Sequence, residues 1–166
     1  MKDERIILGI DPGFIAAGFS VILVTSGRII LKEAGALRQS STHTIPHRIL
    51  CFHDFFSSKI VEMGVTELAL ETPFLGKNAQ NFLKLGYLRG VLLFLAERNE
   101  LVVHEFAPRQ VKRALTGYGQ ADKMQVFRVL SRLFPGFSQP DSLDVSDAVA
   151  IGLCAAWQSG VVVAKR

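Results

Sequence analysis

The sequence predicts an α/β fold: a mixed five-stranded sheet flanked by helices. Apolar β-branched runs and longer segments of helical periodicity follow in the order three strands, helix, strand, helix, strand and three helices. The 166 residues, 49% of them hydrophobic and 20% charged, predict a single domain over 1–166. The longest uncharged apolar runs, 90–96 and 148–157, are shorter than the about 20 residues of a spanning helix, so we expect them in the core and no membrane partner.

The N-terminal part predicts three antiparallel strands. The run "RIILGI" is β-branched and apolar, and "DPG" ends it as a turn, because Pro12 fixes φ and Gly13 permits a positive φ. The stretch "TSGR" predicts a hairpin between the second and third strands. The expected strands are 5–10, 16–24 and 29–37.

The remaining chain predicts helices alternating with short strands. Apolar residues at helical spacing, with Gly64 as a stop, predict a helix over 44–64. A long helix over 79–99 contains Gly86 and Gly90, which allow close approach of another backbone. The other expected elements are strands at 65–72 and 101–108 and helices at 109–117, 121–134 and 141–160.

Positive charge is concentrated in two stretches. The net charge is +4, but residues 109–132 carry six cations against Asp122 alone, and 72–96 carry three cations and no acid. Phosphates dock on such surfaces, although a solvated helix face is an equally acceptable explanation of charge counts. The cations are Lys77, Lys84, Arg89, Arg109, Lys112, Arg113, Lys123, Arg128 and Arg132.

The cysteines and the N-terminus favour a cytoplasmic protein. Cys51 and Cys154 lie far apart, with no CxxC or Cys/His ligand spacing, so neither a disulfide framework nor a zinc site is expected. The N-terminal segment reaches Asp11 before an apolar signal core develops.

Four acids could meet at one edge of the predicted sheet. Asp11 ends the first strand and Glu71 the fourth; if these strands are parallel neighbours, both carboxylates emerge at the same edge. Asp144 and Asp147 share one face of the last helix near its start. Each acid has a plainer explanation as a turn former, a surface acid or a partner of the helix dipole, and only their convergence predicts a site.

Converging carboxylates need a cation between them, because like charges in a partly buried site repel. Oxygen ligands without His or Cys favour magnesium or manganese over zinc. Two such ions can activate water and stabilise a leaving oxygen in phosphodiester hydrolysis, and the cationic helices would then hold a nucleic acid.

Four motifs together resemble the RuvC family of Holliday-junction resolvases, from about Ile6 to Trp157. They are "ILGIDPGxxxxG", "ETPFLGKNAQNFLKLGYLRG", "APRQVKRALTGYGQADKMQV" and "DVSDAVAIGLC", in the family's order and at matching separations. The resemblance implies a ribonuclease-H-like fold, a homodimer, and magnesium-dependent paired nicking of four-way DNA junctions in recombination and repair. It also implies a partnership with the RuvAB branch-migration complex.

The resemblance also assigns site residues. The family's metal-binding catalytic acids fall on Asp11, Glu71, Asp144 and Asp147. Its phosphate-contacting lysines fall on Lys112 and Lys123, and its base-stacking loop aromatic falls on Phe74. Two stretches, "ETPF" and "PGFIAAG", depart from the family pattern, and Pro73 stiffens the Phe74 loop. Charge adds Lys77, Lys84, Arg89 and Arg109 as expected DNA contacts.

The helix over 79–97 is the expected dimer surface, since paired cuts in a symmetric junction require two sites. Its alternative is a helix buried within one subunit. Alternative functions are a ribonuclease-H-like nuclease acting on RNA or other branched DNA, and a non-catalytic junction-binding module. The stretch "GIDPG" also resembles the phosphate-binding turn of actin-like kinases, which need a second such turn and usually two domains.

Overall fold

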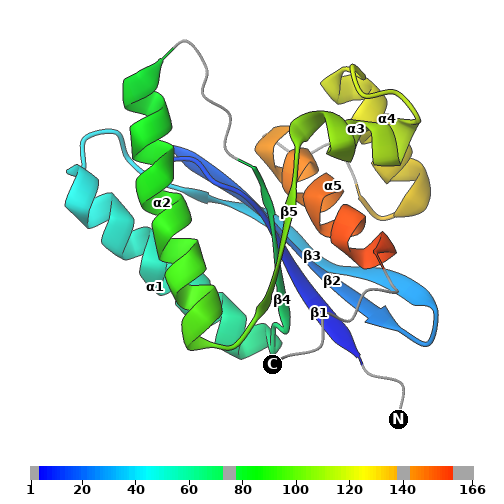
Figure 1. Ribbon diagram of the computed structural model, residues 1–166, viewed down its shortest axis with the longest axis horizontal. Coiled ribbons are helices and arrows are strands. Elements are labelled where there is room, and N and C mark those ends of the chain that lie inside the picture. The colour runs from blue at the N-terminus through cyan, green and yellow to red at the C-terminus, as the bar shows by residue number, and fades with distance from the viewer. Residues whose placement is uncertain (1–3, 73–77, 138–142, 159–166) are drawn as a thin grey trace.

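A computed structural model describes residues 4–72, 78–137 and 143–158 of the chain (Figure 1). The predicted order of elements is confirmed, and the sheet has the strand order β3-β2-β1-β4-β5. The elements are β1 (Arg5–Asp11), β2 (Ala16–Thr25), β3 (Arg28–Arg38), α1 (Ile45–Met63), β4 (Glu67–Glu71), α2 (Ala79–Arg98), β5 (Val102–Phe106), α3 (Pro108–Thr116), α4 (Lys123–Leu133) and α5 (Leu143–Trp157).

The sheet is mixed, as predicted. Strands β1, β2 and β3 are antiparallel, and the predicted turn between β2 and β3 has positive φ at Ser26 and Gly27. Strand β4 then pairs in parallel with β1, and β5 pairs in parallel with β4. Because α1 and α2 provide these crossovers, the first and fourth strands end at the same edge of the sheet.

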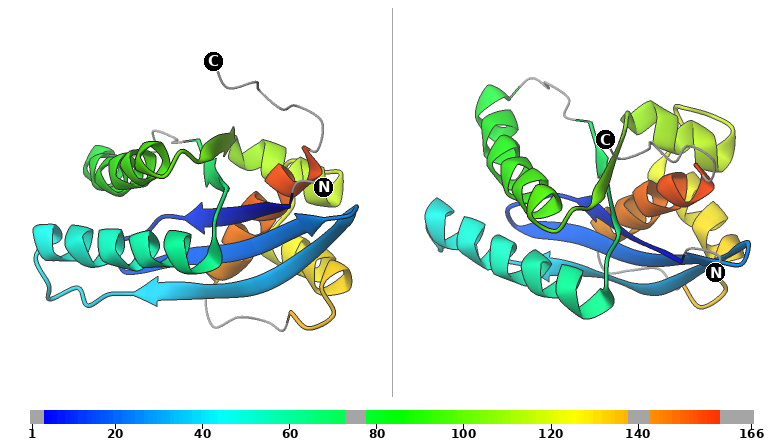
Figure 2. Two further views of the ribbon diagram at one scale, coloured as in Figure 1. Left: turned by 90° about the horizontal axis from the view of Figure 1, so that it is seen from below. Right: turned by 60° about the horizontal axis from the view of Figure 1, so that its bottom comes forward.

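Helices cover both faces of the sheet (Figures 1 and 2). Side chains alternate between the faces, so Leu8 and Leu68 pack with α1 and α2, whereas Ile7 and Ala69 pack with α3, α4 and α5. Helix α5 is buried along most of its length, as expected for the apolar run 148–157, except that Trp157 at its end is 42% exposed.

The helix ends follow the sequence. Thr44 caps the start of α1 and Gly64, at φ 62°, ends it. Helix α4 begins with a capping box, in which Asp122 accepts from the backbone of Gln125 while the Gln125 side chain accepts from the backbone of Asp122.

The prediction that run 90–96 is wholly core is wrong. Leu93 and Phe94 are 40% and 54% exposed, because α2 buries only one narrow stripe against the sheet. Gly86 and Gly90 also face open space, since no other element of the described chain comes within 4 Å of the position that a Cβ would occupy on either glycine. The close approach expected at these glycines does not occur within the described part of the chain.

Two smaller findings complete the fold. Cys51 and Cys154 are both free thiols, as expected. Among the described residues, no helix combines the length and apolarity required to cross a bilayer.

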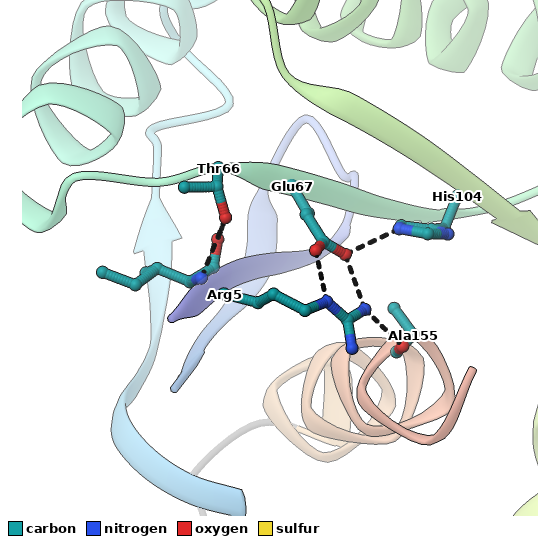
Figure 3. Close-up of polar contacts among 6 residues, drawn as sticks. Arg5, Thr66, Glu67, His104 and Ala155 are labelled. Atoms are coloured by element: carbon teal, nitrogen blue, oxygen red, sulfur yellow. Dashed lines mark hydrogen bonds and ion pairs between the residues drawn. The ribbon is translucent and has the colours of Figure 1, made fainter. Parts of the chain in front are cut away.

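A partly buried polar cluster ties β1, β4, β5 and α5 together (Figure 3). It lies at the ends of β1 and β4 opposite those that carry Asp11 and Glu71. Glu67 is 7% exposed and accepts two hydrogen bonds from the Arg5 guanidinium. Its Oε2 atom also lies 2.7 Å from Nε2 of His104. Arg5 also donates to the carbonyl oxygen of Ala155 in α5, at 3.1 Å. These contacts fix the relative positions of elements that carry acids at their other ends.

We expect Glu67→Gln to destabilise the protein by roughly 3 kcal/mol at pH 7, since it leaves a partly buried guanidinium without its carboxylate. Burial acts against ionisation of Glu67, but bonding to Arg5 and His104 prevails and lowers its pKa to about 2. The stabilisation is therefore complete above the unfolded pKa of about 4.5 and is lost as the pH falls towards 2. Urea unfolding at pH 7 and pH 3 measures this. Glu62→Gln, which removes an exposed carboxylate from α1, is the control, and equal losses in both variants would contradict the prediction.

Candidate functional site

Asp11 is the last residue of β1, pairs with Gly18 of β2 and is half-buried. The turn that follows differs from the prediction in one respect: Gly13 does not have a positive φ. A side chain there would instead collide with the carbonyl oxygen of Ala16. The glycine is needed for space, and the tight turn directs the chain back into β2 beside Asp11.

Helix α5 lies unusually close to the sheet beside Asp11, because glycines line the contact. A Cβ on Gly9 would lie 2.5 Å from the Ala148 carbonyl oxygen, and a Cβ on Gly18 would overlap the backbone of Asp144. Ser20, fully buried, donates to the Ala148 carbonyl at 2.9 Å. The first turn of α5, which carries the remaining predicted acids, is therefore placed directly over the end of β1.

Three of the four predicted acids form one group. One carboxylate oxygen from each of Asp11, Asp144 and Asp147 lies within 4.8 Å of those of the other two. Among the residues that the structure describes, no other His, Cys, Asp or Glu side chains form such a group. Glu71 lies outside it, at the end of neighbouring β4, but its charge still acts on Asp11.

Burial and mutual repulsion raise the pKa values of the acids at this edge, and nearby lysines offset the rise only in part. Burial, followed by the charges of Asp147, Glu71 and Asp144, raises the pKa of Asp11 to about 7. Burial and Asp147 also raise the pKa of Glu71, while Lys112 and Lys123 act in the opposite direction. A carboxylate group held in this way favours a bound cation, since a cation stabilises the ionised form of each acid.

The two predicted lysines lie at this group. The Lys123 ammonium donates to Asp147 at 2.8 Å, and this bond is the main reason that the pKa of Lys123 is raised. Lys112 is half-buried on α3 and close enough to Glu71 for its charge to oppose the rise in the Glu71 pKa. Both therefore supply positive charge beside the acids.

Four further residues are predicted DNA contacts: Phe74, Lys77, Lys84 and Arg109. Phe74 and Lys77 lie outside the described residues. Lys84 is half-buried on α2, and Arg109 is exposed on α3. Contact of these residues with DNA stays a prediction.

Arg89 has an internal role that the sequence did not reveal. Its guanidinium forms an ion pair with Glu105 of β5 and donates to the Glu71 carbonyl oxygen at 3.0 Å. It thus fixes the backbone that carries Glu71. Arg89 is the one charged residue in the otherwise uncharged stretch 85–96, which could have indicated an internal ion pair. The residue spacing does not identify Glu105 as its partner.

The donor set fits a hard divalent cation. The group offers carboxylate oxygens alone, with no imidazole or thiolate, and these are the ligands that magnesium and manganese prefer. Besides burial, the charges of three neighbouring acids raise the pKa of Asp11, and Lys123 offsets them only in part. The acidic group could therefore bind a metal ion.

Similarity to known proteins extends along nearly the whole chain. Residues 7–155 match the profile of the family described as crossover junction endodeoxyribonuclease RuvC. A protein of that name from Prosthecochloris aestuarii is 40% identical over 150 residues, covering 90% of this chain and 80% of the relative. Another from Rickettsia bellii is 35% identical and covers 88% of this chain and 93% of the relative.

A solved structure gives the same result. The structure described as T. thermophilus RuvC in complex with Holliday junction substrate superposes with a TM-score of 0.82 at 25% identity, covering 90% of this chain and 91% of that one. The fowlpox virus resolvase bound to junction DNA, at 14% identity and a TM-score of 0.59, shares the fold.

We expect Asp11→Asn to stabilise the metal-free protein at pH 8. The parent folds with a raised Asp11 pKa, so its stability falls as the pH rises from about 4 to about 7, and Asn removes that loss. About three pKa units, each worth about 1.4 kcal/mol, set an upper limit of about 4 kcal/mol. Urea unfolding in EDTA across this pH range measures the effect.

Asp54→Asn, on the exposed surface of α1, is the matched control and should unfold as the parent does. Identical stability of the parent and Asp11→Asn at pH 8 in EDTA would contradict the predicted repulsion.

Proposed function

The chain belongs to the RuvC family of crossover junction endodeoxyribonucleases, and from that premise we propose that it resolves Holliday junctions by paired, symmetric nicks. It is a nuclease that hydrolyses phosphodiester bonds, and four-way junction DNA is its substrate. This function is favoured over action on RNA and over a non-catalytic binding module.

One observation supports the catalytic assignment most directly: Asp11, Asp144 and Asp147 converge at the edge where β1 ends. The first strand and the last helix bring mutually repelling carboxylates together, which lowers stability unless a bound cation offsets the repulsion. Glu71, whose carbonyl is held by Arg89, adds a fourth carboxylate at the same edge.

We assign the metal ligands to Asp11, Glu71, Asp144 and Asp147, with magnesium as the ion, manganese as a substitute and two ions per site. Bound there, divalent ions would supply an acidified water as nucleophile and would stabilise the leaving oxygen. The acids themselves fix the coordination, because each projects from the end of a strand or from a helix packed on the sheet.

Lys112 and Lys123 have the complementary role. They lie beside the acids on α3 and at the start of α4, and a phosphodiester approaching the carboxylates would meet both ammonium groups. Their charge opposes the repulsion between phosphate and carboxylates and stabilises negative charge that develops on the phosphate.

A homodimer follows from the symmetry of the substrate, and we place its interface on α2. Leu83, Tyr87 and Phe94 are 56%, 41% and 54% exposed, and they follow one stripe of the helix at intervals of four and seven residues. Gly86 and Gly90 lie on the same face with open space before them. A second copy of α2 could pack closely there.

Two wider assignments rest on the length of the chain and on its family. We propose that residues 1–166 act as a single nuclease domain and that the RuvAB branch-migration complex is a partner. Recombination and DNA repair are the processes that this activity serves.

On a mobile synthetic four-way junction, we expect magnesium-dependent nicks at symmetric positions in two strands of like polarity. EDTA should abolish them, and Asp11→Asn should lower the rate by at least about a thousandfold while junction binding persists. Mapping the cuts on all four strands provides the measurement, with Asp54→Asn as a control that should cut normally. Equal cutting of linear or RNA substrates would contradict the proposed substrate.

At micromolar concentration, we expect the protein to elute as a dimer, and Phe94→Asp to elute as a monomer because it places a charge in the apolar stripe. Val61→Asp changes an exposed apolar residue of α1 and should remain dimeric. A monomeric parent, at both low and high salt, would refute the assembly.

A further inference from the structure

An open groove of about 600 Å³ lies between α3 and the segment that joins it to α4. One wall is the face of α3 that carries Arg109, Gln110 and Arg113. The other wall is formed by residues 117–120, with the Tyr118 ring 58% exposed. None of the assigned catalytic residues lines this groove.

The wall opposite α3 is held by hydrogen bonds. Gly117, at φ 77°, ends α3 and donates to the Arg113 carbonyl at 2.9 Å. The Thr116 hydroxyl accepts from the Tyr118 backbone at 3.1 Å and lies 2.8 Å from the carbonyl of Lys112. Gly119 packs against the Arg109 carbonyl, where a Cβ would lie 3.2 Å away. The groove is therefore preformed, and Tyr118 is held at its rim.

Within the described part of the chain, no carboxylate forms an ion pair with the arginines of the groove. Arg5 and Arg89 each pair with a carboxylate, whereas Arg109 and Arg113 form no ion pair with any described residue. They are four residues apart, so they share a face of α3 about 6 Å apart along the helix axis. Two exposed guanidinium groups beside an aromatic ring favour an anion attached to a flat or apolar group, which a nucleotide provides.

The position of the groove indicates which part of the DNA it meets. Lys112 lies between the two arginines in the sequence of α3 and acts on Glu71, and Lys123 follows the Tyr118 segment and bonds to Asp147. The two lysines that act on the acids therefore lie on, or directly after, the elements that form the groove. A strand whose scissile phosphate lay at the acids would extend over it.

We propose that this groove anchors the backbone of the cleaved strand beyond the cut, with Arg109 and Arg113 on one phosphate and the Tyr118 ring against the adjoining sugar or base. The inference rests on the proposed junction cleavage. Phosphate contacts position a protein without reading sequence, so the groove sets affinity and register and leaves sequence preference unchanged.

The test measures junction binding against salt in an Asp11→Asn background, which prevents cutting. Replacing both Arg109 and Arg113 by Ala should weaken binding roughly tenfold and make the slope of log affinity against log salt shallower by about 1, the loss of one phosphate contact. Tyr118→Ala should weaken binding about fivefold, and Tyr118→Phe, which keeps the ring, should restore it.

Arg28→Ala is the matched control, because Arg28 is exposed at the β2–β3 hairpin, at the opposite edge of the sheet from Asp11. Unchanged affinity and slope in the double variant, or a loss equal to that of Arg28→Ala, would overturn the groove assignment. If the parent chain with native Asp11 neither binds nor cuts junctions, the proposed function itself fails, which distinguishes the two outcomes.

Discussion

The close contact between α5 and the strands β1 and β2 is the constraint on which the rest of the structure depends. Gly9, Gly18 and Gly152 leave no side chain between the helix and the sheet, and Ser20 bonds to the helix backbone. Asp144 and Asp147 reach Asp11 only because of this contact. The sheet contributes the fourth acid, because the parallel pairing of β1 and β4 brings Glu71 to the same edge as Asp11.

The two edges of the sheet treat buried acids in opposite ways. At one edge, Glu67 is surrounded by Arg5 and His104, which lower its pKa and make it a structural carboxylate. At the other, Asp11 is surrounded by further acids, and burial and repulsion raise its pKa. In the first arrangement, the chain itself supplies the neutralising cation, Arg5. The second would be completed by a bound cation, because Lys112 and Lys123 supply only part of the opposing charge.

Much of this was predictable from the sequence, because strand periodicity, turn residues and helix caps act locally. The element order and the placement of Asp11 and Glu71 at strand ends followed from such local signals. Contacts between distant residues did not: the internal partners of Arg89 and the open surface at Leu93 and Phe94 depend on how α2 packs. Gly13 illustrates the same limit, since its neighbour Ala16 excludes a side chain only after β2 has folded back.

The central claim is that the fold gathers Asp11, Asp144 and Asp147 to hold divalent metal. A crystal structure of the protein in manganese, with anomalous diffraction, tests it most directly. We predict an anomalous peak between these three carboxylates, with Glu71 at its margin. A peak elsewhere, or an empty carboxylate group at millimolar manganese and pH 8, would contradict the claim.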